Sequence, residues 1–226
     1  MLNDLISLFY PSVCAACSNS LYKHESVICN QCYVSLPKSN YHTNPNNPLA
    51  NVLKGRFPFM EASAFYLFKK KSKVQHLLHQ LKYKNRPDIG ITVGKWMAED
   101  LKKSNFANVD MIIPVPLHPK KQIQRGYNQS TQIANGIGSK LLIPVLEDVL
   151  YRKAATKTQT KKGKVDRWEN VEDVFDIHTS AQLEGKKIIL IDDVITTGST
   201  IEACAIAIHK EANVQLYILS MAFAEQ

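Results

Sequence analysis

Apolar residues along the chain follow two kinds of pattern, and the two kinds alternate. Short apolar runs predict strands at residues 61–68 (EASAFYLF, alternating and aromatic), 109–117 (VDMIIPVPL), 186–191 (KKIILI) and 214–224 (VQLYILSMAFA). Apolar residues at helical spacing predict helices at 73–84, 90–103, 129–141 and 199–212. The later runs are continuous, as expected of strands buried on both faces. The sequence therefore predicts an α/β domain with a mainly parallel sheet flanked by helices.

Helical spacing also separates inward from outward side chains. In helix 73–84 the inward positions are Val74, Leu77, Leu78 and Leu81, which leaves His76 and His79 as surface residues and not ligands. The inward residues expected in helix 90–103 are Trp96, Met97 and Leu101. Cys204, on helix 199–212, is expected to be a small core residue.

Length and composition set the scale of the fold. The chain has 226 residues, of which 45% are apolar, enough for one full domain and a small module. Its formal net charge of +8 suits anionic partners such as phosphates, nucleotides or nucleic acid, although a solvated basic surface explains it equally well. No signal peptide is visible and no run approaches the roughly 20 apolar residues of a membrane span, so a cytoplasmic protein is expected.

Four of the five cysteines form two C-x-x-C pairs, Cys14 with Cys17 and Cys29 with Cys32. Each pair can bind a metal from one turn, and two pairs complete a tetrahedral thiolate site. Because disulfides are disfavoured in the cytoplasm, we expect a structural zinc site, with no open position for catalysis. The spacing between the pairs is slightly short for a zinc ribbon, and His24 is an alternative ligand that four thiolates make unnecessary.

A segment rich in Asn and Pro, residues 39–51, is predicted to be a linker. The chain is accordingly expected to divide into a zinc-binding module (1–38), this linker (39–51) and the α/β domain (52–226).

The segment IILIDDVITTGST, residues 188–200, carries the chemistry. Asp192 and Asp193 follow a buried strand, and ligands of open parallel sheets bind beyond the carboxyl ends of the strands. The next helix opens with hydroxyls and free backbone N–H groups that suit a phosphate, at Thr196, Thr197, Gly198, Ser199 and Thr200. Carboxylates beside a phosphate suit sugar hydroxyls or a metal, so the segment predicts a ribose 5-phosphate site.

Other interpretations of this segment are weaker. The nucleotide P-loop pattern and the glycine-rich dinucleotide turn are both absent from the chain. Acids that merely stabilise the helix start would not explain two acids, two threonines and a glycine together.

The motifs, taken in order, resemble the ComF family of competence-associated, phosphoribosyltransferase-like proteins. Residues 188–200 resemble the ribose-phosphate signature of the wider type I phosphoribosyltransferases, which bind phosphoribosyl pyrophosphate (PRPP). The resemblance covers nearly the whole chain, through CAAC and CNQC, LKYK, IPVPLH, RGYNQS, Thr156 with Gln159, Arg167 with Asn170, Phe175 and DDVITTGST.

The resemblance implies a role for each matching residue. Asp192 and Asp193 would contact the ribose 2′- and 3′-hydroxyls, and residues 196–200 would surround the 5′-phosphate. Mg²⁺ would bridge the pyrophosphate and the ribose hydroxyls. The pyrophosphate would face the backbone amides of a loop, with further donors from two side chains; the residues are Val115, Pro116, Leu117 and His118 for the loop, and His118 and Arg125 for the side chains. RGYNQS would lie in or near the region that covers the site, and Asn128 is alternatively a helix cap.

The resemblance leaves the reaction open. An active enzyme would break the bond at the anomeric carbon as pyrophosphate departs, but the acceptor is undefined. Thr196 stands where hypoxanthine–guanine enzymes usually have an Asp, which argues against that role, and the absence of an N-terminal Cys nucleophile argues against an amidotransferase.

The family's tie to DNA uptake suggests an alternative of another class. The chain would then be a non-catalytic ribose-phosphate sensor, or a protein that handles single-stranded DNA or binds competence proteins. Lysines at 69–73 and 153–164 could follow a phosphate backbone or simply form a solvated surface.

Overall fold

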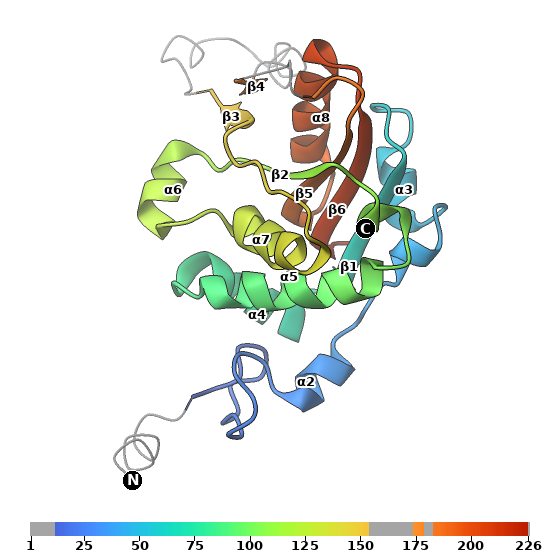
Figure 1. The fold of residues 1–226 in the computed structure, drawn as a ribbon. Coiled ribbons are helices and arrows are strands. Elements are labelled where there is room, and N and C mark those ends of the chain that lie inside the picture. The colour runs from blue at the N-terminus through green and yellow to red at the C-terminus, as the bar shows by residue number, and fades with distance from the viewer. Residues whose placement is uncertain (1–11, 154–173, 179–182, 226) are drawn as a thin grey trace.

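The computed structural model describes residues 12–153, 174–178 and 183–225. A four-stranded sheet with the order β1-β6-β5-β2 forms its centre (Figure 1), and every neighbouring pair of strands is parallel. The strands are β1 (Glu61–Leu67), β2 (Met111–Pro114), β5 (Lys187–Ile195) and β6 (Gln215–Phe223). A two-stranded antiparallel sheet joins β3 (Leu150–Arg152) to β4 (Phe175–Ile177). The predicted α/β class with a parallel sheet is confirmed.

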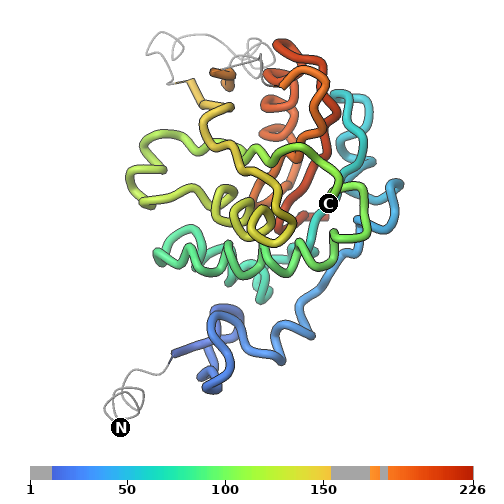
Figure 2. The backbone as a smooth tube through the Cα atoms, in the orientation of Figure 1, coloured from blue at the N-terminus to red at the C-terminus, as the bar shows by residue number. Residues whose placement is uncertain are grey.

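Helices cover both faces of this sheet (Figure 1). One face carries α4 (Lys73–Tyr83), α5 (Pro87–Leu101) and α7 (Gln129–Leu141), and the other carries α3 (Pro48–Leu53) and α8 (Ser199–Glu211). The shorter helices are α2 (Asn30–Ser35), η1 (Tyr41–Thr43), η2 (Asn105–Ala107) and α6 (Pro119–Arg125). Figure 2 shows the cysteine-bearing N-terminal segment at one end of the molecule, next to α4. None of the helices in the described part of the chain is long and apolar enough to cross a membrane.

Side chains of β5 alternate between two cores. Ile189 and Ile191 pack with α4, α5 and α7, whereas Ile188 and Leu190 pack with α3 and α8. Since side chains of a strand point to opposite faces in turn, a strand covered on both faces must be apolar throughout. β1 is also buried on both faces, although its sequence alternates.

Glycines bring α5 and α7 unusually close together. A Cβ at Gly94 would lie 2.2 Å from the carbonyl oxygen of Ile133, and one at Gly136 would lie 2.4 Å from that of Ile91. Neither position has room for a larger residue. This contact fixes α7 against the rest of its layer and so places the first turn of α7 at the edge of the sheet.

Most of the predicted elements are confirmed, with shifted ends. α5 begins at Pro87 instead of residue 90, because proline fits the first position of a helix. The expected end of the strand before Asp192 was wrong, since β5 continues through both acids to Ile195 and pairs Val194 with Ala222 of β6. Met97, Leu101 and Cys204 are buried and His76 and His79 are exposed, as predicted.

Residues 39–51, expected to be a linker, contain η1 and the start of α3. The side chain of Asn47 caps α3 by accepting from the N–H of Ala50 and is itself buried, where it donates to the carbonyl of Ala62 in β1 at 2.8 Å. Pro48 occupies the first turn of the helix. The Asn and Pro residues therefore start a packed helix here. The division of the chain at 38 and 51 stays a prediction.

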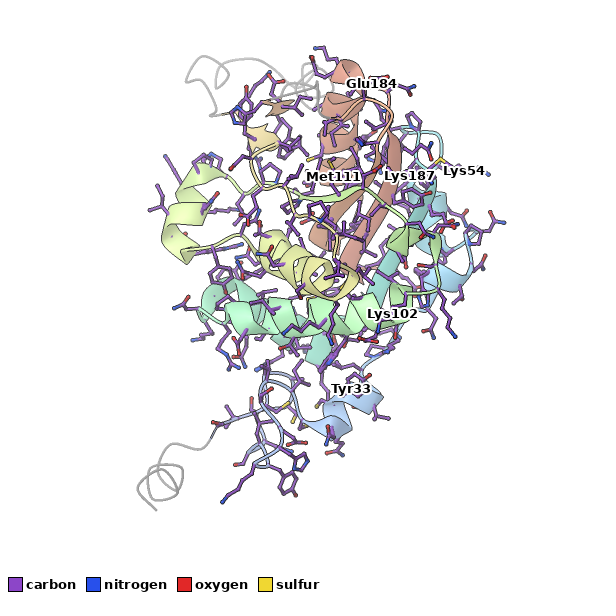
Figure 3. The ribbon with its side chains drawn as sticks, viewed as in Figure 1. Tyr33, Lys54, Lys102, Met111, Glu184 and Lys187 are labelled. Carbon is purple, nitrogen blue, oxygen red and sulfur yellow. The ribbon has the colours of Figure 1, made fainter. Side chains whose placement is uncertain are left out.

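The N-terminal segment packs against α4 and α5. Tyr33 of α2 meets Trp96 of α5 edge to face at 4.6 Å between ring centroids; Trp96, expected to point into the core, is only partly buried. Lys38 pairs with Asp100 at 2.9 Å. Figure 3 shows Tyr33 on the helix α2, near the bottom of the view.

Candidate functional site

The carboxyl ends of β2 and β5 meet at one edge of the sheet. Figure 3 shows Met111 and Lys187, the first residues of the two strands, near each other at the opposite end. Pro114 is in register with Ile191, and the N–H of Val115 donates to the carbonyl of Ile191 at 2.9 Å. The two segments that the sequence singled out, residues 115–118 and 192–200, therefore start side by side.

Asp192 and Asp193 form an acid pair whose oxygens are held by distant elements. Asp192 Oδ1 accepts from Ser130 Oγ in the first turn of α7 at 3.1 Å and from the N–H of Asp193 at 2.8 Å. Asp193 is buried, and its Oδ1 pairs with Lys82 Nζ of α4 at 2.8 Å. Burial, and next the charge of Asp193, raise the pKa of Asp192 to about 7.

The loop from Thr196 to Gly198 leads from β5 into α8. Gly198 has a φ of 79° and is the N-cap of α8, so no side chain caps the first N–H groups of this helix. Those groups and the helix dipole favour an anion. A hollow of about 40 Å³ lies here, lined by Asp192 and residues 194–201. Thr196, Thr197, Ser199 and Thr200 are exposed beside it.

Arg56 supports this loop from behind. It donates to the carbonyl of Thr197 and forms an ion pair with Glu202 in the first turn of α8. A Cβ at Gly198 would lie 2.6 Å from Leu53 Cδ2 and 3.0 Å from Arg56 Nη1. Glycine is therefore required both for the backbone conformation and for the close approach of α3.

The segment after β2 offers fewer amides than the sequence suggested. The N–H of Val115 is already bonded to Ile191, and Pro116 has no N–H. This limits the predicted amide contacts with a pyrophosphate to Leu117 and His118. The His118 side chain caps α6 by accepting at Nδ1 from the N–H of Lys120, which leaves Nε2 to carry a hydrogen.

Arg125 is the last residue of α6, and its contacts in the described part of the chain are with Gln129 and Tyr83 and not with the acid pair. Its Nη1 donates to Gln129 Oε1 at 2.7 Å, and its guanidinium lies 5.1 Å from the ring centroid of Tyr83. His118 and Arg125 are thus held at opposite ends of α6.

The RGYNQS motif joins three parts of the site. Tyr127 Oη donates to the carbonyl of Leu81 in α4, and Asn128 Nδ2 donates to the carbonyl of Val115 at 2.9 Å. The Asn128 side chain also caps α7, as the alternative interpretation predicted. Gln129 and Ser130 are buried, so this half of the motif lies inside the fold and does not cover the site.

Two residues of this site were missed by sequence reasoning, Lys82 and Ser130. Both belong to motifs that carry the family resemblance, LKYK and RGYNQS. Membership of those motifs was the available signal, but only the packing of α4 and α7 shows that the two side chains reach the acids.

The acid pair and the hydroxyls beside it provide oxygen ligands only. Mg²⁺ prefers such ligands and is commonly held by one or two carboxylates together with substrate phosphates. The donor set at Asp192 and Asp193 therefore fits Mg²⁺.

The four cysteines of the two C-x-x-C motifs converge on one point of the N-terminal segment. The Sγ atoms of Cys14, Cys17, Cys29 and Cys32 all lie within 4.8 Å of one another, and those of Cys17 and Cys29 are 3.8 Å apart. Zn–S bonds of about 2.3 Å in a tetrahedron place sulfur atoms about 3.8 Å apart, so the cluster fits zinc.

Hydrogen bonds distinguish the thiols of this cluster. Burial raises the pKa of Cys14, but N–H groups of Cys29 and Ala16 outweigh it and lower that pKa to about 7. Burial raises the pKa of Cys32. His24, the alternative ligand, is exposed, and its Nε2 lies 3.3 Å from Asn30 Nδ2.

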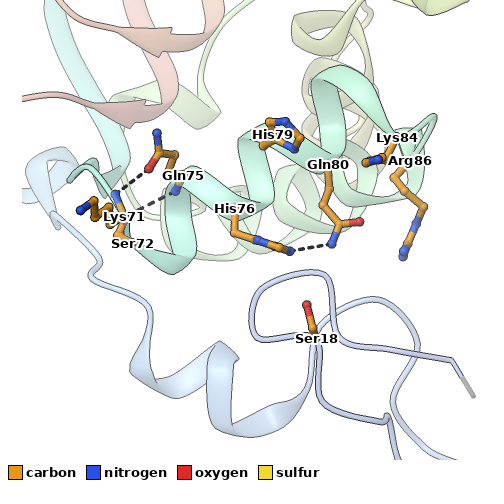
Figure 4. Close-up of a pocket in the computed structure, with 9 residues that line it drawn as sticks. All are labelled: Ser18, Lys71, Ser72, Gln75, His76, His79, Gln80, Lys84 and Arg86. Atoms are coloured by element: carbon orange, nitrogen blue, oxygen red, sulfur yellow. Dashed lines mark hydrogen bonds between the residues drawn. The ribbon is translucent and has the colours of Figure 1, made fainter.

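A larger cleft, of about 780 Å³, separates α4 from the N-terminal module (Figure 4). Among the residues that the structure describes, its lining includes cationic groups and histidines but no acid: Ser18, Lys71, Ser72, Gln75, His76, His79, Gln80, Lys84 and Arg86. Lys71 precedes the N-cap of α4, and Lys84 and Arg86 follow the end of this helix. Of the two lysine-rich segments, 69–73 borders this cleft, whereas all of 153–164 except Lys153 lies outside the described residues.

Comparison with known proteins identifies the family. The model of the phosphoribosyl transferase domain matches residues 79–219. Competence protein F of Haemophilus influenzae is 29% identical over 153 residues, which are 66% of this chain and 67% of that protein. The DNA utilization protein YhgH of Shigella flexneri is 25% identical over 204 residues, 88% of this chain and 85% of that protein.

A solved structure titled as the glutamine PRPP amidotransferase of B. subtilis, complexed with ADP and GMP, aligns with a TM-score of 0.45 and 18% identity, over 63% of this chain and 30% of that one. This chain thus spans less than a third of that enzyme. The chain belongs to the phosphoribosyl transferase domain family and, within it, to the competence-associated ComF proteins.

Proposed function

We propose that this protein binds PRPP together with Mg²⁺ at the carboxyl edge of β2 and β5, and that it serves DNA uptake. The observation that carries the proposal is the acid pair beside the uncapped first turn of α8. The names of the relatives, Competence protein F and DNA utilization protein, support the link to DNA.

Each part of the ligand has a matching group in this proposal. The first N–H groups of α8 and the hydroxyls of residues 196–200 donate to the 5′-phosphate. Asp192 and Asp193 accept from the ribose 2′- and 3′-hydroxyls, and each such charged hydrogen bond contributes on the order of 1.5–3 kcal/mol. The amides of Leu117 and His118 and the imidazole Nε2 of His118 face the diphosphate. Mg²⁺, when bound, neutralises the charge of the diphosphate as it departs.

We also propose that the chain retains pentosyl transfer to an acceptor still to be identified. Positive charge develops at the anomeric carbon when the bond to the diphosphate breaks, and two carboxylates nearby stabilise that charge. Thr196, in place of an Asp, argues against hypoxanthine or guanine as the acceptor. Release of pyrophosphate, measured with and without single-stranded DNA, separates an active enzyme from a protein that only senses the ligand.

The binding proposal is tested by removing the acids. Asp192→Asn combined with Asp193→Asn should abolish the calorimetric signal for PRPP with Mg²⁺. The matched control is Asp148→Asn, the same change at an exposed position outside the site. Unchanged affinity of the double variant would contradict the proposal.

The cysteine cluster, in the same proposal, holds one structural Zn²⁺ and ties the N-terminal module to the core. The four converging sulfur atoms support this. Metal analysis of freshly purified protein should find about one zinc per chain. A folded protein without metal would refute it.

A second candidate function is binding of single-stranded DNA in the cleft beside α4 (Figure 4). It is supported by the cationic groups Lys71, Lys84 and Arg86, although Arg86 also pairs with Asp88 at 2.8 Å, and by the two histidines of the lining. The ring of the exposed Tyr83 lies 5.0 Å from that of His79, and the guanidinium of Arg125 lies 5.1 Å from the Tyr83 ring centroid. Groups on which bases could stack therefore continue from the cleft toward α6.

The salt dependence of DNA binding tests this candidate. Lys71→Gln with Lys84→Gln should lower the slope of log affinity against log salt by about 1.4, because each phosphate contact on a single strand contributes about 0.7. Lys95→Gln with Lys103→Gln, two exposed lysines outside the cleft, is the control with equal charge. An equal change in both double variants would show a general effect of charge and no binding in the cleft.

A further inference from the structure

An ion pair inside the site joins two elements that are far apart in the sequence. Lys82 Nζ of α4 lies 2.8 Å from Asp193 Oδ1 of β5, and the two side chains are only 21% and 9% exposed. A lysine in the last turn of a helix commonly stabilises the helix dipole from the surface. Lys82 instead turns its ammonium group into the site.

The end of α4 that carries Lys82 is fixed next to the segment after β2. Tyr127 Oη donates to the carbonyl of Leu81, the residue before Lys82. The next residue of the same motif, Asn128, donates to the carbonyl of Val115. Lys82 is therefore anchored between the acid pair on one side and the start of residues 115–118 on the other.

The acid pair needs a cation when no ligand is bound. Two carboxylates in adjacent, largely buried positions repel each other, and an uncompensated buried charge is costly. Among the residues that the structure describes, Lys82 is the cationic side chain that pairs with them. It acts as their counter-ion.

A ligand that uses these acids must change this pair. Sugar hydroxyls at Asp193 compete with the ammonium group as donors to the same carboxylate oxygens. Mg²⁺ at Asp193 competes more strongly, because two cations repel each other at short range. PRPP also brings a diphosphate, and a lysine is a common partner of phosphate oxygens. The ligand thus both displaces Lys82 and offers it a new anion.

We propose that Lys82 is an exchangeable counter-ion: it neutralises Asp193 in the empty protein and moves to the diphosphate when PRPP and Mg²⁺ occupy the acid pair. This inference rests on the proposed binding of PRPP. It assigns a ligand-binding role to Lys82, the first lysine of LKYK, and a positioning role to Tyr127.

The exchange predicts effects of opposite sign on two ligands. In Lys82→Met, Mg²⁺ alone should bind about tenfold more tightly, because its competitor at Asp193 is gone. PRPP at saturating Mg²⁺ should bind about tenfold more weakly, because its diphosphate has lost a charged donor. Both affinities can be measured by calorimetry on the full chain. Lys95→Met, at an exposed position on α5, should change neither.

The opposite signs separate the exchange from damage to the fold, which would weaken both ligands together. Weaker or unchanged Mg²⁺ binding by Lys82→Met would overturn the proposal. If the wild-type protein binds PRPP, equal PRPP affinity of Lys82→Met would also overturn it. A wild-type protein that fails to bind PRPP would overturn the proposed function, and the exchange with it.

Lys82→Arg decides the question if the Met variant does not fold. A guanidinium holds a carboxylate through two parallel hydrogen bonds and is harder to displace than an ammonium group. This variant should therefore bind Mg²⁺ a few-fold more weakly than the wild type. Equal Mg²⁺ binding by the two proteins would overturn the exchange.

Discussion

Two clusters of like ionisable groups lie in the part of the chain that the structure describes, and they differ in which groups can neutralise their charge. In the N-terminal module four sulfur atoms converge, and N–H groups of Ala16 and Cys29 point at Cys14. At the edge of the sheet two carboxylates meet, and Lys82 supplies a cation from a distant helix. Four ligands around one point suit a metal that stays, whereas two carboxylates with a lysine suit a ligand that comes and goes.

The surroundings of the two clusters agree with this difference. Three of the four cysteines, Cys14, Cys29 and Cys32, are buried, in a hydrophobic cluster that continues into α4 and α5. The acid pair lies beside exposed hydroxyls and a helix with an uncapped first turn. The cysteine cluster is largely closed to solvent, as expected of a structural metal site. The acid pair lies beside groups that a ligand can reach, as expected of a ligand-binding site.

The largest effect is expected at the closed cluster. Cys32→Ser should lose zinc and unfold the N-terminal module, because structural zinc contributes on the order of 10 kcal/mol to small domains. Thermal unfolding and metal analysis measure both consequences. Cys204→Ser removes a buried thiol outside the cluster and should keep the zinc. Loss of zinc from both variants would contradict the assignment of the cluster.

A smaller effect, dependent on pH, is expected at the open pair. Burial and Asp193 raise the pKa of Asp192 from 3.8 to about 7, so its protonated form is favoured by folding. The stability it contributes is complete below about pH 4 and is lost as the pH rises through about 7. Between these limits Asp192→Asn should gain stability relative to the wild type, by no more than about 4 kcal/mol.

Urea unfolding of both proteins at pH 5 and pH 8, without Mg²⁺, measures this difference. Asp148→Asn, at an exposed position, should show no such trend. A difference between the Asp192 variant and the wild type that does not depend on pH would show that the environment of Asp192 is not the one described.

The packing of Leu53 and Arg56 behind the loop from Thr196 to Gly198 predicts the next effect. Gly198→Ala should cost about 2–3 kcal/mol, because the new Cβ meets Leu53 and Arg56 in addition to the strain of a positive φ. Gly55→Ala is a matched control with a φ of 80° and nothing within 4 Å of the added carbon, and should cost about 1 kcal/mol. Chemical denaturation compares the two, and equal costs would mean that the loop can move away from α3.

The smallest effect is expected at the anchor of α4. Tyr127→Phe removes the hydrogen bond to the carbonyl of Leu81 and should cost about 1 kcal/mol of stability. Because that bond positions Lys82, affinity for PRPP should also fall a few-fold. Tyr22→Phe, at a residue that is 74% exposed, should change neither quantity. A stable variant with full affinity would remove Tyr127 from the account.

The fold was largely predictable because strands buried on both faces leave continuous apolar runs. Two of the helices that were missed, α3 and α6, start with signals that also mark loops. α3 and α6 both place a proline in their first turn, Pro48 and Pro119, after a residue whose side chain caps the helix, Asn47 and His118. Short helices of this kind carry too few apolar residues for their period to be seen.

The candidate site was predictable where its residues are neighbours in sequence, as in residues 192–200. Lys82 and Ser130 were not assigned, since their contact with the acids depends on how α4 and α7 pack on the sheet. The amide of Val115 was expected to face a ligand, but the parallel register commits it to Ile191. Register and packing are three-dimensional facts that one sequence does not contain.

The central claim is that the acid pair and the start of α8 bind one ribose phosphate. Phosphorus NMR of PRPP with Mg²⁺ observes the 5′-phosphate and the diphosphate as separate signals, and shows free pyrophosphate if any is released. The account predicts that the wild-type protein shifts or broadens both ligand signals and that Asp192→Asn with Asp193→Asn leaves both unchanged. Unperturbed signals with folded, zinc-loaded wild-type protein would contradict it.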